Sequence, residues 1–233
     1  MSGHRQLPLD FEHRPSLTGD NFLVVDSNRD AVGSLDRWPD WPTPALVIYG
    51  PAGCGKTHLA HAFLARSGGR RLSILDLSAD EPRDLIEDVP ACVMEDAERF
   101  LEAGLEGALL HLYNALKEAG GHMLLTSRQP PARWQIRLAD LRSRLNAATA
   151  VAIGAPDDAL MEAVVVKLFA DRQLKVGPDV VAFMVLRMER SFEAARELVA
   201  RIDAAALRAR RKITIRLVRE VLEGAGGADS TDE

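Results

Sequence analysis

The feature that most constrains the fold of this chain is the segment GPAGCGKT at residues 50–57, which matches the phosphate-loop pattern G-x-x-x-x-G-K-[ST]. An apolar run at residues 45–49 leads into the segment, and a helical pattern follows it at residues 58–65. A strand, a loop and a helix in this order point backbone N–H groups and the helix N-terminus at an anion, and glycines let the backbone close around phosphate oxygens. The sequence therefore predicts an α/β protein that holds ATP or ADP at the end of a strand.

Two side chains of this loop have predicted roles. Lys56 is expected to reach the β- and γ-phosphates, and the Thr57 hydroxyl to ligate Mg²⁺. The alternative is a glycine turn with an incidental lysine, which the flanking strand and helix patterns disfavour. The residues expected to surround the nucleotide phosphates are Gly50, Pro51, Ala52, Gly53, Cys54, Gly55, Lys56, Thr57 and His58.

A second acidic feature follows the apolar run at residues 91–94, where Glu95 and Asp96 stand side by side. The carboxyl end of a strand is the place where an α/β sheet presents groups to its ligand. This is the position of a Walker B motif, in which Glu95 is expected to orient Mg²⁺ and Asp96 to polarise the attacking water. The alternative is that the two acids only begin an exposed helix at residues 97–101, where negative charge suits the helix dipole.

The order of the segments predicts two parts. Up to about residue 155, short apolar runs alternate with amphipathic stretches, which predicts a parallel sheet covered by helices. After Pro156 the pattern is helical, with Asp157 and Thr214 as N-caps and Pro178 in a first turn, which predicts a small α-helical lid. Strands are expected at 45–49, 72–77, 91–94, 122–126 and 149–153, and lid helices at 157–170, 178–190, 193–210 and 214–222. The expected organisation is an extended arm at residues 1–20, a nucleotide-binding α/β domain at 21–155, the lid at 156–223 and a disordered acidic tail at 224–233.

Composition excludes several classes of partner. A formal net charge of -5 gives no reason to expect duplex DNA binding through the overall field. The two cysteines form neither a disulfide framework nor a metal-ligand spacing, and no run of 18 apolar residues predicts a membrane span. We therefore expect a cytoplasmic protein with no membrane partner.

Three further segments carry a resemblance to a known family. They are DNFLVVDSN at residues 20–28, LLTSR at residues 124–128 and LRSRL at residues 141–145. Together with the phosphate loop, the acidic pair and the helical lid, they resemble the AAA+ initiator family DnaA, and more closely the shorter regulatory family Hda. The resemblance spans roughly residues 20–222 and implies an AAA+ fold followed by a lid.

The resemblance also implies roles for single residues. Phe22 is expected near the adenine, and Thr126 or Ser127 is expected to sense the γ-phosphate. Arg144 falls on the position of the arginine finger, a residue that completes the ATP site of a neighbouring subunit. The alternative for Arg144 is a surface arginine that pairs with Asp140 four residues earlier on the same helix.

Two DnaA features are missing from this sequence. Only residues 78–90 separate the second and third expected strands, which leaves no room for the helices that contact single-stranded DNA in DnaA. The sequence also stops after the lid, without a helix-turn-helix region for duplex DNA. We therefore expect no direct sequence-specific DNA binding.

The N-terminal arm carries the peptide QLPLDF at residues 6–11, which resembles the short segment by which replication proteins dock on the DNA polymerase sliding clamp. In an extended peptide, apolar side chains can fill a pocket while an amide hydrogen-bonds at its rim. The expected clamp-binding residues are Gln6, Leu7, Leu9 and Phe11. The alternative is that the apolar members of this set pack on the protein's own sheet.

Two departures from the family pattern bear on mechanism. Glu95 stands where Walker B usually has Asp, so its carboxylate is one methylene further out. On the expected sensor II helix, Glu193 stands where an Arg normally meets the phosphates, and Arg196 lies three residues later. Both departures favour an ADP-bound working form with slow intrinsic hydrolysis.

The resemblance implies a nucleotide-bound regulator that docks on the sliding clamp and promotes hydrolysis of DnaA-bound ATP, which limits re-initiation of replication. In this reading the enzymatic effect falls on the partner's ATP, through Arg144 in trans. Two alternatives stay open: a self-oligomerising AAA+ ATPase that remodels or loads a replication protein, and an adaptor whose nucleotide is structural.

Overall fold

The computed structural model describes residues 24–209 and 211–223, and these residues form two compact units. The first unit contains residues 24–49 and 56–153, and the second contains residues 50–55 and 154–223. The peptide of residues 6–11 and Phe22 lie outside the described residues. None of the described helices is long and apolar enough to cross a membrane.

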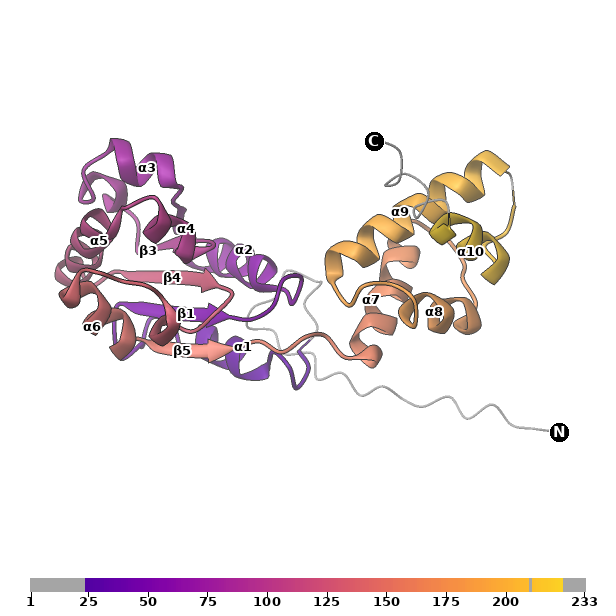
Figure 1. Cartoon of the computed structure of the whole chain (residues 1–233), viewed down its shortest axis with the longest axis horizontal. Helices are drawn as coiled ribbons and strands as arrows, with labels where there is room; N and C mark the ends of the chain where they lie inside the picture. Colours follow the sequence, from indigo (N-terminus) through magenta and orange to yellow (C-terminus); the bar gives the residue numbers. More distant parts are fainter. Residues whose placement is uncertain (1–23, 210, 224–233) are drawn as a thin grey trace, which may run out of the picture. The chain divides into compact units, whose positions relative to one another are not determined.

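The first unit is built on a five-stranded parallel sheet with the order β2-β3-β4-β1-β5 (Figure 1). Strand β4 lies between β1, which leads into the phosphate loop, and β3, which leads into the acidic pair Glu95 and Asp96. The strands are β1 (Ala45–Tyr49), β2 (Arg70–Arg71), β3 (Ala91–Met94), β4 (His122–Ser127) and β5 (Thr149–Ala152). The predicted positions of β1, β3, β4 and β5 are confirmed to within one residue at each end.

The prediction of a strand at residues 72–77 is wrong. The sheet contains only β2 there, and helix α3 (Ile74–Ala79) follows. Ser73 begins this helix with a capping box: its hydroxyl accepts from the N–H of Asp76, and the Asp76 carboxylate accepts from the N–H of Ser73 (2.7 Å). These bonds satisfy the helix start and lower the pKa of Asp76, mainly through the Ser73 side chain. The local cap thus stabilises a helix in an apolar run that also fits a strand.

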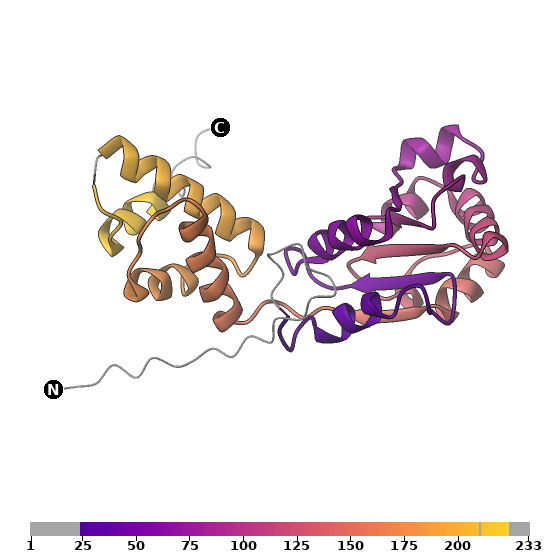
Figure 2. The same ribbon diagram turned by 180° about the vertical axis from the view of Figure 1, so that it is seen from behind.

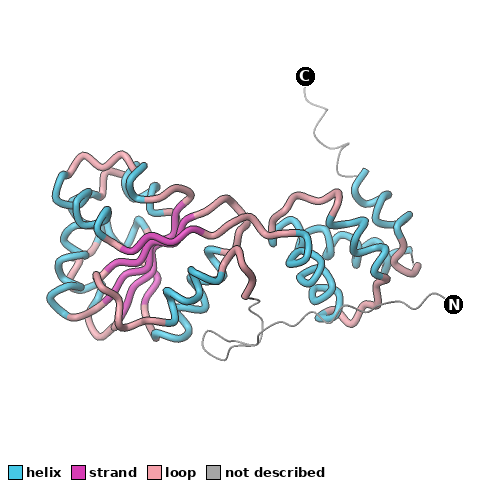
Figure 3. The backbone as a smooth tube through the Cα atoms, turned by 90° about the horizontal axis from the view of Figure 1, so that it is seen from below, coloured by secondary structure: helices cyan, strands magenta, loops and turns pink. Residues whose placement is uncertain are grey.

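Helices cover both faces of this sheet, as Figure 3 shows. One face packs on helices after β3 and β4, through alternate strand residues such as Val47, Met94 and Leu125. The opposite face meets the helices before and after β1, where Phe63 is fully buried. The helices of this unit are α1 (Arg29–Asp36), α2 (Lys56–Ser67), α3, α4 (Ala97–Glu102), α5 (Glu106–Ala119) and α6 (Ala139–Ala147), with short 3-10 turns at Asp84–Ile86 and Pro131–Arg133.

The second unit is helical after residue 157, as the sequence predicts (Figure 2). Its apolar core joins all of its helices through side chains such as Phe169, Met184 and Ile202. Asp157 accepts from the N–H of Leu160 (2.7 Å), which confirms the predicted N-cap. The helices are α7 (Asp158–Asp171), α8 (Pro178–Val185), α9 (Phe192–Ala209) and α10 (Ile215–Glu223).

Helix α8 ends five residues before the predicted position. After Val185, Leu186 is 73% exposed, and Met188 is only partly buried against the core of this unit. A new helix start follows at Ser191, whose hydroxyl accepts from the N–H of Ala194 (3.0 Å). Lost burial and a competing N-cap together end α8 early.

Candidate functional site

The phosphate loop has the backbone that its glycines permit. Gly53 and Gly55 have φ angles of +69° and +101°, in the left-handed region that side chains disfavour. Lys56 is the first residue of α2, and its side chain is buried with partners in the protein, whereas Thr57 is exposed. Cys54 is buried within the loop. The loop therefore joins β1 directly to a helix N-terminus, which is the arrangement that binds anions.

The acidic pair follows β3, and its two residues differ in backbone and surroundings. Asp96 has a left-handed backbone (φ 53°) and precedes α4, but its side chain does not cap that helix. Its N–H donates to the Thr126 hydroxyl of β4 (3.1 Å). A left-handed non-glycine residue is costly and is found where surrounding contacts impose it, often at functional sites. The structure thus brings Asp96 and Thr126 together at one edge of the sheet.

Glu95 is almost completely buried, with 11% of its side chain exposed. Its Oε1 atom has no hydrogen-bond donor among the described residues, although the Arg71 guanidinium lies 3.1 Å away as an ion pair. Arg71 is 60% exposed, so solvent weakens this ion pair. The only cation that faces this oxygen among the described residues is therefore one that solvent screens, and a carboxylate in that situation can instead ligate a hard cation such as Mg²⁺.

The two candidate sensors are both buried at the end of β4, but their hydroxyl groups are used differently. Ser127 donates to the carbonyl of Gln129 (2.6 Å) and so shapes the turn that follows the strand. Thr126 accepts from the N–H of Asp96, and among the described residues no acceptor takes the proton of its hydroxyl. A free hydroxyl proton is what a phosphate oxygen requires, so the geometry favours Thr126.

Arg144 lies on α6, in the first unit. Its guanidinium donates to both carboxylate oxygens of Asp140, at 3.2 and 3.0 Å, which is the pair that the surface-arginine alternative predicts. The guanidinium carbon also lies 5.5 Å from the centre of the Tyr113 ring on α5. Arg144 is thus held in a defined place rather than free in solvent, with 28% of its side chain exposed.

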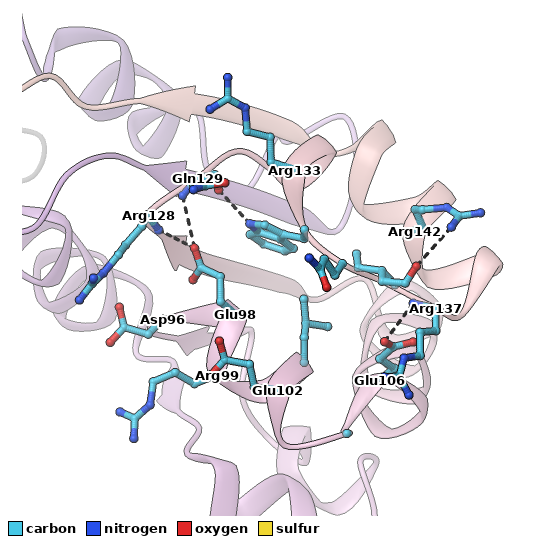
Figure 4. A pocket seen from close by; sticks show the side chains of 15 residues that line it. Asp96, Glu98, Arg99, Glu102, Glu106, Arg128, Gln129, Arg133, Arg137 and Arg142 are labelled. Atoms are coloured by element: carbon cyan, nitrogen blue, oxygen red, sulfur yellow. Dashed lines mark hydrogen bonds between the residues drawn. The ribbon is translucent and has the colours of Figure 1, made fainter.

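A groove of about 1250 Å³ opens between α4 and the segment that connects β4 to α6, residues 128–138 (Figure 4). Two carboxylates hold the ends of this connecting segment. Glu98 accepts from the N–H groups of Arg128 (2.7 Å) and Gln129 (3.3 Å). Glu106 accepts from the N–H groups of Arg137 (3.0 Å) and Leu138 (2.7 Å).

Sequence reasoning missed Glu98, Glu106 and Tyr113. The carboxylates bond to backbone N–H groups about thirty residues away, and such partners leave no pattern in side-chain types. Tyr113 reads as one more apolar position of an amphipathic helix. The spacing of Asp140 and Arg144 was the one readable signal here.

Glu193 and Arg196 both lie in the first turns of α9 in the second unit, and both are exposed. Within the described residues, Glu193 and Arg196 do not form an ion pair with each other.

Comparison with known proteins gives a consistent relationship. The family model described as "Hda, lid domain" matches residues 159–222. An uncharacterised protein of Haemophilus influenzae is 25% identical over 94% of this chain and 99% of its own length. The chromosomal replication initiator DnaA of Thermomicrobium roseum is 29% identical over 89% of this chain but 50% of its own length. The chain thus spans about half the length of the initiator relatives that it matches.

Solved structures agree on the fold. Domain III of DnaA from Thermotoga maritima superposes with a TM-score of 0.77 at 16% identity, covering 91% of this chain and 97% of that domain. AMPPCP-bound DnaA from Aquifex aeolicus gives a TM-score of 0.72 at 18% identity, covering 91% of this chain and 70% of that one. The chain is thus similar to DnaA over most of its length, has the AAA+ fold of DnaA domain III, and carries a lid region that matches the Hda lid family.

Proposed function

We propose that this protein, with nucleotide in its phosphate loop, docks on the sliding clamp and promotes hydrolysis of ATP bound to the initiator DnaA, which limits re-initiation of replication. The observation that carries the proposal is the Hda lid match on a DnaA-like AAA+ fold. Regulation of replication initiation follows from that relationship. The clamp, the partner's ATP and the role of Arg144 are the finer parts of the proposal.

The protein's own nucleotide site serves to hold ADP or ATP. Lys56, at the start of α2, neutralises phosphate charge, and the N–H groups of the loop contact the phosphate oxygens. Thr57 and Glu95 would hold Mg²⁺, which neutralises negative charge on the phosphates when bound. Thr126 contacts the γ-phosphate oxygen when one is present, while Asp96 orients the water.

Two features make ADP the favoured working ligand. Arg71 already neutralises Glu95, so a cation at Glu95 must compete with the guanidinium. On the family's sensor II pattern, Glu193 would face the γ-phosphate, and like charges at about 4 Å repel by roughly 1–4 kcal/mol between water and a protein surface. Both effects weaken ATP binding and turnover more than ADP binding.

In the complex with DnaA, Arg144 leaves Asp140 and donates to the partner's γ-phosphate. The developing charge on the transferring phosphoryl group draws the guanidinium more strongly in the transition state than in the ground state. Until then Asp140 holds the Arg144 guanidinium on α6. To reach the phosphate, Arg144 must exchange the Asp140 carboxylate for a phosphate oxygen.

Replacing Arg71 with alanine should allow half-maximal ATP binding at a lower Mg²⁺ concentration, by about two- to fivefold, because the competing guanidinium of a largely exposed ion pair is removed. A titration of Mg²⁺ at fixed ATP, followed by fluorescence of a labelled nucleotide, measures the shift. Arg70→Ala is the matched control, since Arg70 is the neighbouring arginine of β2 and has no ion pair with Glu95 among the described residues. An identical Mg²⁺ dependence in wild type and Arg71→Ala would count against Glu95 as the metal ligand.

The clamp contact is tested separately through the N-terminal arm. We expect the double variant Gln6→Ala/Leu9→Ala to lose clamp-dependent stimulation of DnaA-bound ATP hydrolysis, while its nucleotide affinity stays at the wild-type value. The assay compares hydrolysis of radiolabelled ATP on DnaA with and without DNA-loaded clamp. Ser16→Ala/Leu17→Ala, a polar and apolar pair elsewhere in the same arm, is the control. Stimulation that does not depend on the clamp would remove the clamp from the proposal.

A further inference from the structure

The start of helix α6 depends on a residue of another helix. The residue that precedes α6, Leu138, has no side chain that can cap it, although the first N–H groups of a helix need acceptors. Glu106, the first residue of α5, accepts with one carboxylate oxygen from the N–H of Leu138 (2.7 Å), the first of these groups, and with the other from the N–H of Arg137 (3.0 Å), one residue before the helix start. Two charge-assisted hydrogen bonds thus join the start of α5 to the start of α6 (Figure 4).

The Glu106 carboxylate is ionised at neutral pH. The hydrogen bond from the Arg137 N–H is the main cause that lowers the pKa of Glu106 below its usual value of 4.5, against an opposing effect of burial. Because the folded-state pKa is lowered, the two hydrogen bonds are fully present above pH 4.5 and are lost only as the pH falls through the folded-state pKa.

A second contact between the same helices lies next to Arg144. Tyr113 stands seven residues after Glu106 on α5, which places both side chains on one face of that helix. Tyr113 is 5% exposed and packs in the core that includes Leu141 and Leu145 of α6. The Arg144 guanidinium lies 5.5 Å from the centre of this ring, a cation–π distance. Helix α5 therefore contacts α6 at its start and again beneath the arginine.

The distance from the start of α6 to Arg144 determines how far a tilt of the helix would move the arginine. Arg144 stands six positions after Leu138, which is roughly 9 Å along the helix. A tilt of α6 by about 10° around its start would then move Arg144 by roughly 1.5 Å. A displacement of about 1 Å of a catalytic group can cost on the order of 10²-fold in rate.

We infer that Glu106 and Tyr113 are positioning residues for Arg144. Glu106 fixes the start of α6, and the Tyr113 ring fixes how far the guanidinium stands from α5. The inference rests on the proposed function, since it concerns the same arginine. Neither residue is expected to touch DnaA-bound ATP. They set the place from which Arg144 reaches it.

The test uses the full chain with DNA-loaded clamp and ATP-loaded DnaA. It measures the maximal rate of ATP hydrolysis and the concentration of this protein at half-maximal rate. We expect Glu106→Gln and Tyr113→Leu each to lower the maximal rate about tenfold, with the half-maximal concentration unchanged within about twofold. Tyr113→Phe, which keeps the ring, should retain the wild-type rate. Glu102→Gln is the matched control, because Glu102 lines the same groove without a hydrogen bond in the described structure.

Different outcomes identify different failures. If Arg144→Ala abolishes stimulation but both Glu106→Gln and Tyr113→Leu reach the wild-type maximal rate, the inference is wrong and the proposed function stands. If Arg144→Ala itself retains the wild-type rate, the proposed function fails. A maximal rate lowered equally in Tyr113→Phe and Tyr113→Leu would overturn the role of the ring. If Tyr113→Leu does not fold, Glu106→Gln alone decides, since its side chain is isosteric.

Discussion

Replacing Arg144 with alanine should reduce the stimulation of DnaA-bound ATP hydrolysis by at least about a hundredfold. An arginine supplied in trans to a transferring phosphoryl group contributes about 10³–10⁵ in rate in well-studied GTPases. The variant keeps the phosphate loop and the N-terminal arm, so we expect its affinities for nucleotide and clamp to match the wild type. Arg144→Lys should rescue little, because an ammonium group cannot form the bidentate contact of a guanidinium.

The matched control for this experiment is Arg142→Ala. Arg142 is exposed on the same helix and donates to the carbonyl of Ile136 (3.3 Å), away from Asp140. We expect it to retain most of the stimulation. If Arg144→Ala stimulates hydrolysis as strongly as the wild type, Arg144 is not required, and the alternative of an adaptor with a structural nucleotide is favoured. ATP turnover by the isolated protein that rises with its concentration and disappears in Arg144→Ala would instead indicate self-assembly.

Replacing Lys56 with alanine should weaken nucleotide binding by roughly 10- to 150-fold, the equivalent of one hydrogen bond to a charged group, about 1.5–3 kcal/mol. ATP should lose more affinity than ADP, because Lys56 is expected to reach both the β- and γ-phosphates. Calorimetric titration of each nucleotide measures the two losses separately.

Lys117→Ala is the control for Lys56→Ala, since Lys117 is an exposed lysine in the last turn of α5, far along the chain from the loop. Because Lys56 is buried, the thermal unfolding temperature must be compared in the absence of nucleotide. Unchanged affinity in a folded Lys56→Ala protein would contradict the phosphate-loop assignment.

Much of the fold could be predicted from the sequence because its signals are local. The strand at Ala45–Tyr49, the loop and the helix that begins at Lys56 are contiguous in the chain, and each part has its own pattern. The cap at Asp157 likewise involves residues three apart. The wrong strand at residues 72–77 had a readable local signal, the Ser73 and Asp76 capping box, which competes with the apolar run.

The candidate site was predictable only in its contiguous parts. The order of strands in the sheet is a non-local property, so the placement of β4 between β3 and β1, and with it the contact of Thr126 and Asp96, does not follow from element order. The bonds of Glu106 go to backbone groups, which every residue possesses. Periodicity and composition carry no trace of such partners.

The left-handed backbone at Asp96 limits which substitutions can isolate the chemistry of its carboxylate. Aspartate is one of the few non-glycine residues that tolerate a φ of 53°, whereas alanine and especially valine disfavour it, so a loss of activity in those variants would mix backbone strain with the loss of charge. Asparagine tolerates the left-handed region and has nearly the same shape. Asp96→Asn therefore removes the negative charge while preserving the turn, and the N–H to Thr126 stays in place for the comparison.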